Sequence, residues 1–380
     1  MRLSVCMIVR NEESRLAAAI ESVRAVADEI IVTDTGSTDN TIDLARNLGA
    51  RVETFAWCDD FAAARNACAV HARGEWILWL DADEQLKPGN DAGLARDLAD
   101  TRTLAYQLIR EDFFTRDRPD WFSEMYQLRL VRRDLPATFV GRIHEHLVPS
   151  PVEIARKIGK SVKISTARLV HRGYSNDRLP EKMARGAMLC ELELKERPGQ
   201  LYYMVELARS LIALNTPESH ERGNQVLGEA TQLMLSHASD PHPPSTLAAS
   251  LLEQLFAIPD RPWATTDELI DLATRWFPRN PPLVWALART YTYRAQWERA
   301  EQELRKLLEM LRTRNYDHFG SFDPRIAEDA SFNLGVVLVR QARLDEAIEI
   351  FTSLLTSERR AGEARRNLDA ITELKAKFGD

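Results

Sequence analysis

Four short, largely apolar runs that alternate with helical patterns are the feature of this sequence that most constrains its fold. Between the runs, apolar residues recur at helical spacing. Runs of this kind suit strands that are buried on both faces, as in a parallel sheet covered by helices. The first 90 residues therefore predict an α/β domain with a mostly parallel sheet. The predicted strands are Leu3–Val9, Glu29–Asp34, Arg51–Phe55 and Trp76–Asp81.

From about Thr103 to Val170 the pattern is strand-like, with long loops between the candidate strands. We expect this stretch to complete the α/β domain, and we place the end of that domain near Tyr174–Pro180. The predicted first domain is therefore 1–178. The further candidate strands are Leu104–Arg110, Gln127–Arg132, Ile143–Val148 and Val162–Ser165.

The remaining residues, 179–380, have a helical pattern that repeats. Two sets of residues share the same internal offsets, and each member of the second set lies 47 residues after its counterpart. That distance corresponds to one tetratricopeptide period of about 34 residues plus an insertion. We predict an all-α, tetratricopeptide-like domain, with coincidental spacing in ordinary helical packing as the alternative. The sets are Leu287, Ala288, Tyr291, Ala300, Leu304 and Leu334, Gly335, Leu338, Ala347, Phe351.

Composition narrows the classes of protein to which the chain can belong. Lys and Arg number 50 against 57 Asp and Glu, a formal charge of −7, so the basic surface of a nucleic-acid-binding protein is not expected. The four cysteines include no C-x-x-C pair, which disfavours a zinc ribbon or a disulfide framework. No apolar run reaches the length of a membrane span. We expect a cytoplasmic protein that does not span a membrane, with peripheral association at the inner membrane left open.

The strongest local signal for chemistry is the pair Asp81 and Asp83, at the end of the fourth predicted strand. On extended backbone, side chains at i and i+2 point to the same side of a sheet. Ligands of open α/β sheets bind outside the carboxyl ends of the strands, where this pair lies. Carboxylate oxygens suit Mg²⁺ or Mn²⁺, which often also bind a substrate phosphate. A lone Asp-x-Asp is weak support, because such pairs arise by chance in acidic loops.

A second polar cluster, 34–39, follows another predicted strand. One interpretation is a capped turn, in which Ser37 or Asp39 accepts amide hydrogen bonds and Gly36 permits the bend. The other is that Asp34 faces the same crevice and binds donor groups of a base or a ribose. Both interpretations can hold at once.

Four segments in order over residues 3–84 resemble the nucleotide-binding half of family 2 glycosyltransferases, which have the GT-A fold. They are VCMIVRNEE, EIIVTDTGSTDNT, FAWCDDFAAARN and GEWILWLDADE, and GRIHEHL and LVHRGY are similar to later motifs. The closest similarity is to the branch of lipopolysaccharide-core glucosyltransferase-like proteins and S-linked bacteriocin glucosyltransferases. The resemblance covers roughly residues 1–180.

The resemblance implies roles for residues at the nucleotide side of the site. Val9, Arg10 and Glu12 would line the nucleotide pocket, and Asp34 would contact the uridine. Two further residues would lie deeper in the site. Arg65 would lie near the nucleotide or its diphosphate, and Asp81 would contact the ribose or the metal.

The resemblance also assigns the metal and the base. Asp83 would be the principal metal ligand, and His171 would correspond to a late histidine that completes the metal or diphosphate site. Glu145 occupies the place of the catalytic base. The commoner Glu-Asp pair is replaced here by His-Glu-His, so His144 and His146 remain alternatives for the base.

The sequence thus predicts a metal-dependent inverting glycosyltransferase with Mn²⁺ or Mg²⁺ as cofactor. The donor would be a nucleotide sugar, UDP-hexose first, and the acceptor a glycan, a lipid-linked glycan or a peptide. Trp121 and Tyr126 could stack on a sugar. The helical half would bind a polypeptide or a second copy of the protein. The competing hypothesis is a non-catalytic interaction scaffold whose nucleotide-sugar domain is degenerate.

Overall fold

The structure is a computed structural model, and it describes residues 2–113, 122–171, 179–245, 247–258, 262–317, 321–323 and 325–378. The chain divides into two compact units, Met1–Val226 and Leu227–Asp380. The predicted domain boundary after residue 178 lies in the segment 172–178, outside the described residues, and stays a prediction.

The first unit alternates strands and helices and then becomes helical. Its elements are β1 (Leu3–Val9), α1 (Leu16–Val23), β2 (Glu29–Asp34), α2 (Thr41–Asn47), β3 (Arg51–Thr54), α3 (Phe61–Ala69), β4 (Trp76–Trp79), β5 (Glu84–Leu86), α4 (Asp91–Ala99), β6 (Thr103–Phe113), β7 (Phe122–Arg132), β8 (Thr138–Val140), β9 (His146–Val148), α5 (Pro151–Ile158), β10 (Ser161–His171), α6 (Leu179–Glu196), α7 (Leu201–Ala213) and the start of α8 (Pro217–Ser236).

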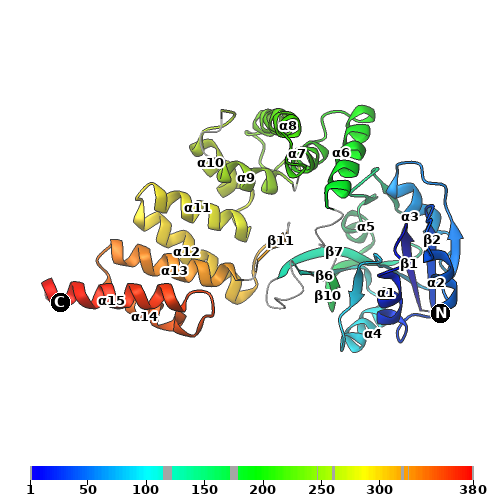
Figure 1. Ribbon diagram of the computed structural model, residues 1–380, viewed down its shortest axis with the longest axis horizontal. Coiled ribbons are helices and arrows are strands. Elements are labelled where there is room, and N and C mark those ends of the chain that lie inside the picture. Colours follow the sequence, from blue (N-terminus) through cyan, green and yellow to red (C-terminus); the bar gives the residue numbers. More distant parts are fainter. Residues whose placement is uncertain are drawn as a thin grey trace. The chain divides into compact units, whose positions relative to one another are not determined.

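One sheet organises this unit, with its strands in the order β3-β2-β1-β4-β7-β6-β10-β5 (Figure 1). Strands β3, β2, β1 and β4 run parallel, whereas β7 and β5 are antiparallel to their neighbours. The chain moves outward from β1 to β3 and then returns to the other side of β1 as β4. Their carboxyl ends therefore form a topological switch point, where such sheets bind ligands. The predicted mostly parallel sheet is confirmed.

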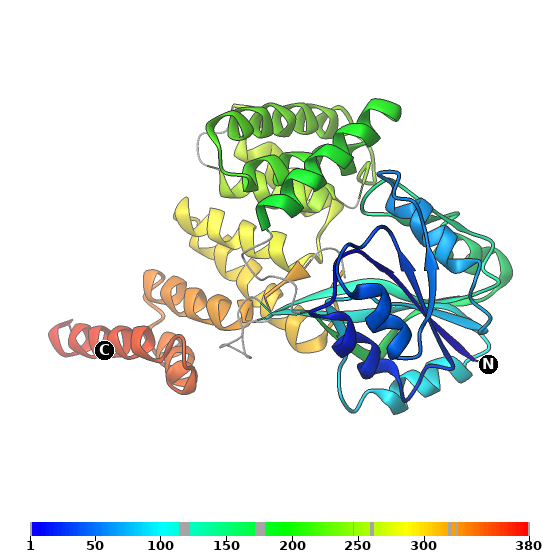
Figure 2. The same ribbon diagram turned by 45° about the vertical axis from the view of Figure 1, so that its right-hand side comes forward.

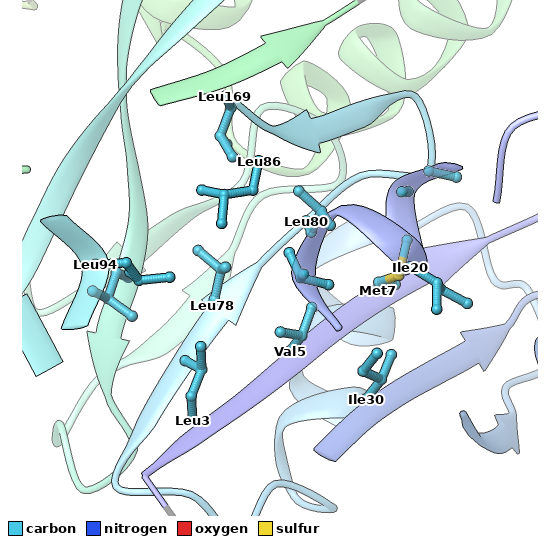
Figure 3. Packing of buried hydrophobic residues seen from close by; sticks show 14 of the residues in the cluster. Leu3, Val5, Met7, Ile20, Ile30, Leu78, Leu80, Leu86, Leu94 and Leu169 are labelled. Atoms are coloured by element: carbon cyan, nitrogen blue, oxygen red, sulfur yellow. The ribbon is translucent and has the colours of Figure 1, made fainter. Parts of the chain in front are cut away.

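Alternating residues of β1 and β4 pack on one face of the sheet, beneath α1 and α4 (Figure 3). Leu3, Val5 and Met7 line this face, with Met7 beside Ile20 of α1, and Leu78 lies toward Leu94 of α4 (Figure 3). These side chains are almost wholly buried. Each such side chain contributes roughly 1.5–3 kcal/mol relative to exposure, which accounts for the strongly apolar runs.

The opposite face is covered by α3 and by the β8–β9 hairpin. Cys6 of β1 and Trp79 of β4 belong to this second core, together with Cys68 of α3. Phe139 of β8 packs edge-on against Trp79, with the ring centroids 5.2 Å apart. Burial of β1 and β4 on both faces explains why their sequences show no polar alternation.

The later strands differ from the predicted bounds. β6, β7 and β10 each extend over 11 residues. The predicted strand at 143–148 is shorter, because only His146–Val148 pair, as β9. The residues that lengthen the strands include polar ones such as Asp112 and His171, which interrupt the apolar pattern by which a strand is predicted. Both lie at the candidate site described below.

Asp100, which ends α4, ties that helix to two strands. Its carboxylate accepts hydrogen bonds from Lys163 Nζ at 2.8 Å, Thr103 Oγ1 at 2.9 Å and Tyr106 Oη at 3.0 Å. The hydrogen bond from Lys163, followed by that from the Arg102 amide, holds the pKa of Asp100 well below its ordinary value.

We expect Asp100→Asn to lower the free energy of unfolding by about 1 kcal/mol at pH 7, because charge-assisted hydrogen bonds are lost at a partly exposed site. A lowered pKa stabilises the fold above the unfolded-state pKa of about 3.9 and loses that effect as the pH falls. The difference from the parent should therefore be constant above about pH 5 and shrink below about pH 4.

Urea unfolding at a series of pH values measures this difference. Asp43→Asn is the control, because Asp43 pairs with Arg46 in an exposed ion pair of little expected worth. An Asp100→Asn difference that did not change with pH would contradict the assignment.

The second unit is formed by helices in succession. Its elements are the end of α8, α9 (Ala248–Ala257), α10 (Thr266–Trp276), α11 (Pro281–Tyr293), α12 (Trp297–Thr313), β11 (Ser321–Phe322), α13 (Ile326–Arg340), α14 (Leu344–Ser353), the 3₁₀ turn Leu354–Thr356 and α15 (Ala361–Phe378).

From α11 to α15, each helix packs on the next (Figures 1 and 2). All ten residues of the two repeated sets are buried, as stacking of helix pairs requires. Gly335 is the counterpart of Ala288 in the second repeated set. A Cβ atom on Gly335 would lie 2.7 Å from the Phe351 ring, so the Phe351 side chain fills the space next to the glycine. The predicted all-α, tetratricopeptide-like domain is confirmed. The predicted insertion lies partly outside the described residues.

None of the helices in the described part of the chain combines the length and the apolar character needed to cross a bilayer.

Candidate active site

The segment Asp81–Glu84 forms a tight turn between β4 and β5. The Glu84 amide donates to the Asp81 carbonyl at 3.0 Å, and the Glu84 carboxylate accepts from the Asp81 amide at 3.1 Å. The expectation that Asp81 and Asp83 lie on extended backbone is therefore wrong. The turn gives the two carboxylates different partners, while both remain at the carboxyl end of β4.

Asp81 is bound by two arginines from other elements. Arg129 of β7 lies 2.7 Å from Asp81 Oδ2 and 2.6 Å from the fully buried Glu84 carboxylate. Arg65 of α3 lies 3.3 Å from Asp81 Oδ1. Burial would raise the pKa of Asp81, but the charges of Arg129 and then Arg65 lower it far below its ordinary value. The Asp81 side chain is still 37% exposed, which leaves an edge open to a ligand.

Arg65 joins Asp81 to Glu145. Its Nε donates to Glu145 Oε1, and its guanidinium lies over the Trp79 ring, 5.0 Å from the centroid. The side chain is 12% exposed. Packing on the ring and two carboxylate partners together fix the guanidinium at the switch point.

Glu145 lies in the loop between β8 and β9, and its side chain is 13% exposed. Its ion-pair partner is Arg65. Among the described residues none hydrogen-bonds Glu145 Oε2, so this oxygen can accept a proton. His144 turns toward Glu206 of α7 at 3.4 Å, and His146 is exposed on β9.

His171 reaches the site through strand register. It pairs with Asp112 of β6 on one side and with Glu84 of β5 on the other, so the end of β10 lies beside the Asp81–Glu84 turn. Its Nδ1 is 2.7 Å from Asp112 Oδ1, and its Nε2 is 3.2 Å from Asp83 Oδ2. Burial would lower the pKa of His171, but the hydrogen bonds of Asp112 and Asp83 raise it.

Glu84, Asp112, Arg110 and Arg129 also lie at the candidate site, and the sequence predicted no role for them. Arg110 Nε lies 2.7 Å from Asp112, and its Nη1 lies 3.3 Å from Glu84. Burial would raise the pKa of Asp112, but His171 and Arg110 lower it. These residues orient the candidate groups from behind. Their one signal was charge within otherwise apolar strand patterns.

Val9, Arg10 and Glu12 lie at the carboxyl end of β1 and just beyond it. The Val9 carbonyl accepts from the Thr35 amide at 3.0 Å, and the Glu12 amide donates to Thr41 Oγ1 at 2.8 Å. These bonds tie the loop after β1 to the loop after β2. Arg10 is exposed, as a group that receives a ligand can be.

Asp34 is 3% exposed at the end of β2. Its carboxylate accepts from the Gly36 amide at 2.9 Å and from the Ser37 amide at 3.0 Å, and Gly36 has a φ of 107°. Ser37 Oγ accepts from the Asn11 amide at 2.9 Å. The capped-turn interpretation is confirmed, and contact with a base stays a prediction.

The nine candidate residues therefore divide into two neighbouring groups at one end of the sheet. Arg65, Asp81, Asp83, Glu145 and His171 form a charged group at β4, and Val9, Arg10, Glu12 and Asp34 surround the ends of β1 and β2. Arg15 of the loop before α1 lies 3.9 Å from Asp83 and connects the two groups. Trp76 and Trp79 are core residues. Tyr126 lies on β7, and Trp121 is outside the described residues.

Asp83 and His171 fit a divalent cation. No group of three or more His, Cys, Asp or Glu side chains within the described ranges is arranged to hold a metal. A carboxylate oxygen and an imidazole nitrogen nevertheless face each other, and the Asp83 side chain is 21% exposed. Magnesium commonly takes one or two protein ligands and completes its shell with water and substrate phosphate.

Part of the chain is similar to known proteins. Residues 4–173 match the sequence model of glycosyl transferase family 2. A TPR repeat-containing protein of Synechococcus elongatus is 34% identical over 216 residues, 56% of this chain and 52% of that protein. The SPbeta prophage-derived glycosyltransferase SunS of Bacillus subtilis is 26% identical over 216 residues, 56% of this chain and 50% of that protein. The chain thus spans about half the length of these relatives.

Solved structures also show similarity. Glucosyl-3-phosphoglycerate synthase from Mycobacterium tuberculosis, in complex with Mn²⁺ and UDP-glucose, is 17% identical with a TM-score of 0.35, covering 51% of this chain and 78% of that one. S. aureus TarS 1–349 is 15% identical with a TM-score of 0.37, covering 85% of this chain and 95% of that one.

Proposed function

We propose that this chain, whose residues 4–173 match the family 2 glycosyltransferase model, transfers a hexose from a UDP-hexose to a glycan or peptide acceptor with inversion of configuration. The observation that carries the proposal is the meeting of Asp83, His171, Arg65 and Glu145 at the carboxyl ends of the central strands. This is where an α/β sheet accepts a ligand.

The donor would bind across the two loops that follow β1 and β2. Val9, Arg10 and Glu12 would line its nucleoside, and Asp34 would meet the uracil or the ribose through its remaining acceptor capacity. Arg65 would lie near the diphosphate, where its carboxylate partners Asp81 and Glu145 reduce the positive charge that it offers. UDP is the first choice of nucleotide because the resemblance implies a uridine site.

Asp83 and His171 would hold Mn²⁺ or Mg²⁺ beside the diphosphate. When bound there, the cation neutralises the charge that develops on the departing diphosphate. Asp112 and Arg110 keep His171 oriented, and Arg129 keeps Asp81 in place. Arg110 and Arg129 are each paired with carboxylates, so they add little net positive charge to the site.

Glu145 would act as the base. The acceptor hydroxyl oxygen attacks the anomeric carbon, and the bond from that carbon to the diphosphate oxygen breaks on the opposite side. The hydroxyl proton passes to Glu145 Oε2, because Oε1 is already held by Arg65. A single displacement of this kind inverts the anomeric centre.

The helical unit would bind a polypeptide, a second copy of this chain or the acceptor itself. Stacked helix pairs form extended surfaces suited to peptides. We propose a cytoplasmic location, where nucleotide sugars would reach the site directly.

A donor screen tests the function. UDP, GDP and dTDP release is measured from a panel of nucleotide sugars, with Mn²⁺ and with excess chelator. We expect UDP release that depends on the cation. Absence of release from every donor, with folded protein, would favour the scaffold hypothesis.

A further inference from the structure

We propose that helices α6 and α7, which follow the family match, complete the active site by holding the loop of Glu145, with Glu193 as the positioning residue. This inference rests on the proposed function, because it concerns the same site. It extends the catalytic unit beyond residue 178.

Glu193 is a fully buried carboxylate on α6, and it is used to hold a backbone amide of the loop. Its Oε2 accepts from the Arg142 amide at 3.0 Å. Its Oε1 accepts from Gln200 Nε2 at 3.3 Å and lies 2.5 Å from Arg197 Nη2. A buried carboxylate is costly unless it is paired, and here the pairing joins α6, the start of α7 and the loop.

Arg142, three residues before Glu145, is held from a second side by the start of α3. Its carbonyl accepts from the Phe61 amide at 2.9 Å, and its Nη1 donates to the Asp59 carbonyl at 3.1 Å. Its Nη2 pairs with Glu196 of α6. The loop is thus hydrogen-bonded both to α6 and to the start of α3, the helix that carries the Glu145 partner Arg65.

α7 closes the other side of the loop. Gly141 has a φ of 99°, and a Cβ atom there would lie 2.2 Å from Tyr203 Oη. His144 Nε2 lies 3.4 Å from Glu206, and the His144 ring packs on Tyr202 with the centroids 5.7 Å apart. Gly141, Arg142 and His144, which precede Glu145, are therefore held by helices outside the family match. Positioning of this kind matters, because an error of about 1 Å at a reacting group costs about 10²-fold in rate.

The first test compares Glu193→Ala with Glu191→Ala in the full chain, since Glu191 lies exposed on the same helix. Amide hydrogen exchange in the peptide 138–148 should be about tenfold faster in Glu193→Ala, because the Arg142 amide loses its acceptor. Transfer should fall at least tenfold while UDP affinity is kept. Glu193→Gln retains an acceptor oxygen and should recover most of both effects.

The second test uses Gly141. Gly141→Ala should slow transfer and shift the unfolding midpoint, and Tyr203→Phe should partly reverse both changes because it removes the atom in closest contact. Some loss should remain in the double variant, since the positive φ still disfavours alanine.

Three results would overturn the proposal. The first is unchanged amide exchange in Glu193→Ala, and the second is an equal loss of UDP affinity and turnover in that variant. The third is a Tyr203→Phe change that does not reverse any of the effect of Gly141→Ala on transfer. Should the parent protein transfer no sugar, the proposed function fails, while the exchange measurement still decides whether α6 holds the loop.

Discussion

Replacing Glu145 by glutamine is expected to reduce sugar transfer by about 10²–10⁴-fold, because the acceptor hydroxyl loses the group that takes its proton. The affinity for UDP should be kept or should rise. Glutamine removes the negative charge paired with Arg65, so the guanidinium becomes freer to meet a diphosphate. Steady-state transfer rates and UDP titration calorimetry measure the two effects separately.

Two controls make the result specific to the base. His144→Ala and His146→Ala should each lower transfer less than Glu145→Gln, since neither histidine contacts Arg65 in the described structure. The product of the parent enzyme should have the inverted anomeric configuration by NMR. A retained anomer, or equal loss of UDP affinity and turnover in Glu145→Gln, would remove Glu145 from this role.

The second large effect is expected at Asp83. Asp83→Ala should reduce cation-dependent turnover by 10² or more, if the cation contributes several kcal/mol to the transition state. Mn²⁺ should also cease to strengthen UDP binding. The fold should persist, because the Asp83 side chain is 21% exposed and its nearest partner, His171, keeps its hydrogen bond to Asp112.

Asp91→Ala is the matched control, because Asp91 is exposed on α4, eight residues further along the chain. Mn²⁺ titration of UDP affinity in both variants provides a readout that does not depend on turnover. Undiminished activity of Asp83→Ala, or of the parent in excess chelator, would remove the cation from the mechanism.

The central strands could be predicted from the sequence because their signal is local. β1 and β4 are buried on both faces, so nearly every position is apolar, and β2 has an apolar run over residues 30–32. The bounds of β1 and β2 agree with the prediction. The same holds for the repeated helix pairs, where small and large residues at fixed offsets mark the packing. Polar residues interrupt β6, β7 and β10, and their full lengths were missed for that reason.

The residues that support the candidate site could not be predicted, because their partners are distant in the sequence. Arg129 meets Asp81 across 48 residues, and His171 meets Asp83 across 88 residues. Arg129 stands out in the sequence only as a charge within an otherwise apolar strand pattern, and that pattern does not identify its partner. The turn at Asp81–Glu84 was missed for a related reason, since the Glu84 side chain that closes it is held by Arg129 and Arg110.

The domain boundary near residue 178 stays a prediction. A change from strand to helical pattern near residue 178 is a genuine feature of the sequence. Glu193 and Tyr203, however, belong to helices that pack on the Gly141–Glu145 loop. The secondary-structure pattern changes near residue 178, but the helices that follow still pack on this loop.

The hydrogen bonds between the loops after β1 and β2 bear on how a donor would arrive. Asn11 and Ser37 are 26 residues apart, and the Asn11 amide already donates to Ser37 Oγ, while Asn11 Oδ1 accepts from the Thr38 amide. The loops that would line a nucleoside are thus joined to each other by hydrogen bonds, and little conformational entropy should remain to be lost there on binding. Binding of a nucleoside at this end of the sheet should then need little loop rearrangement. Its association rate should be limited by diffusional encounter rather than by ordering of the loops.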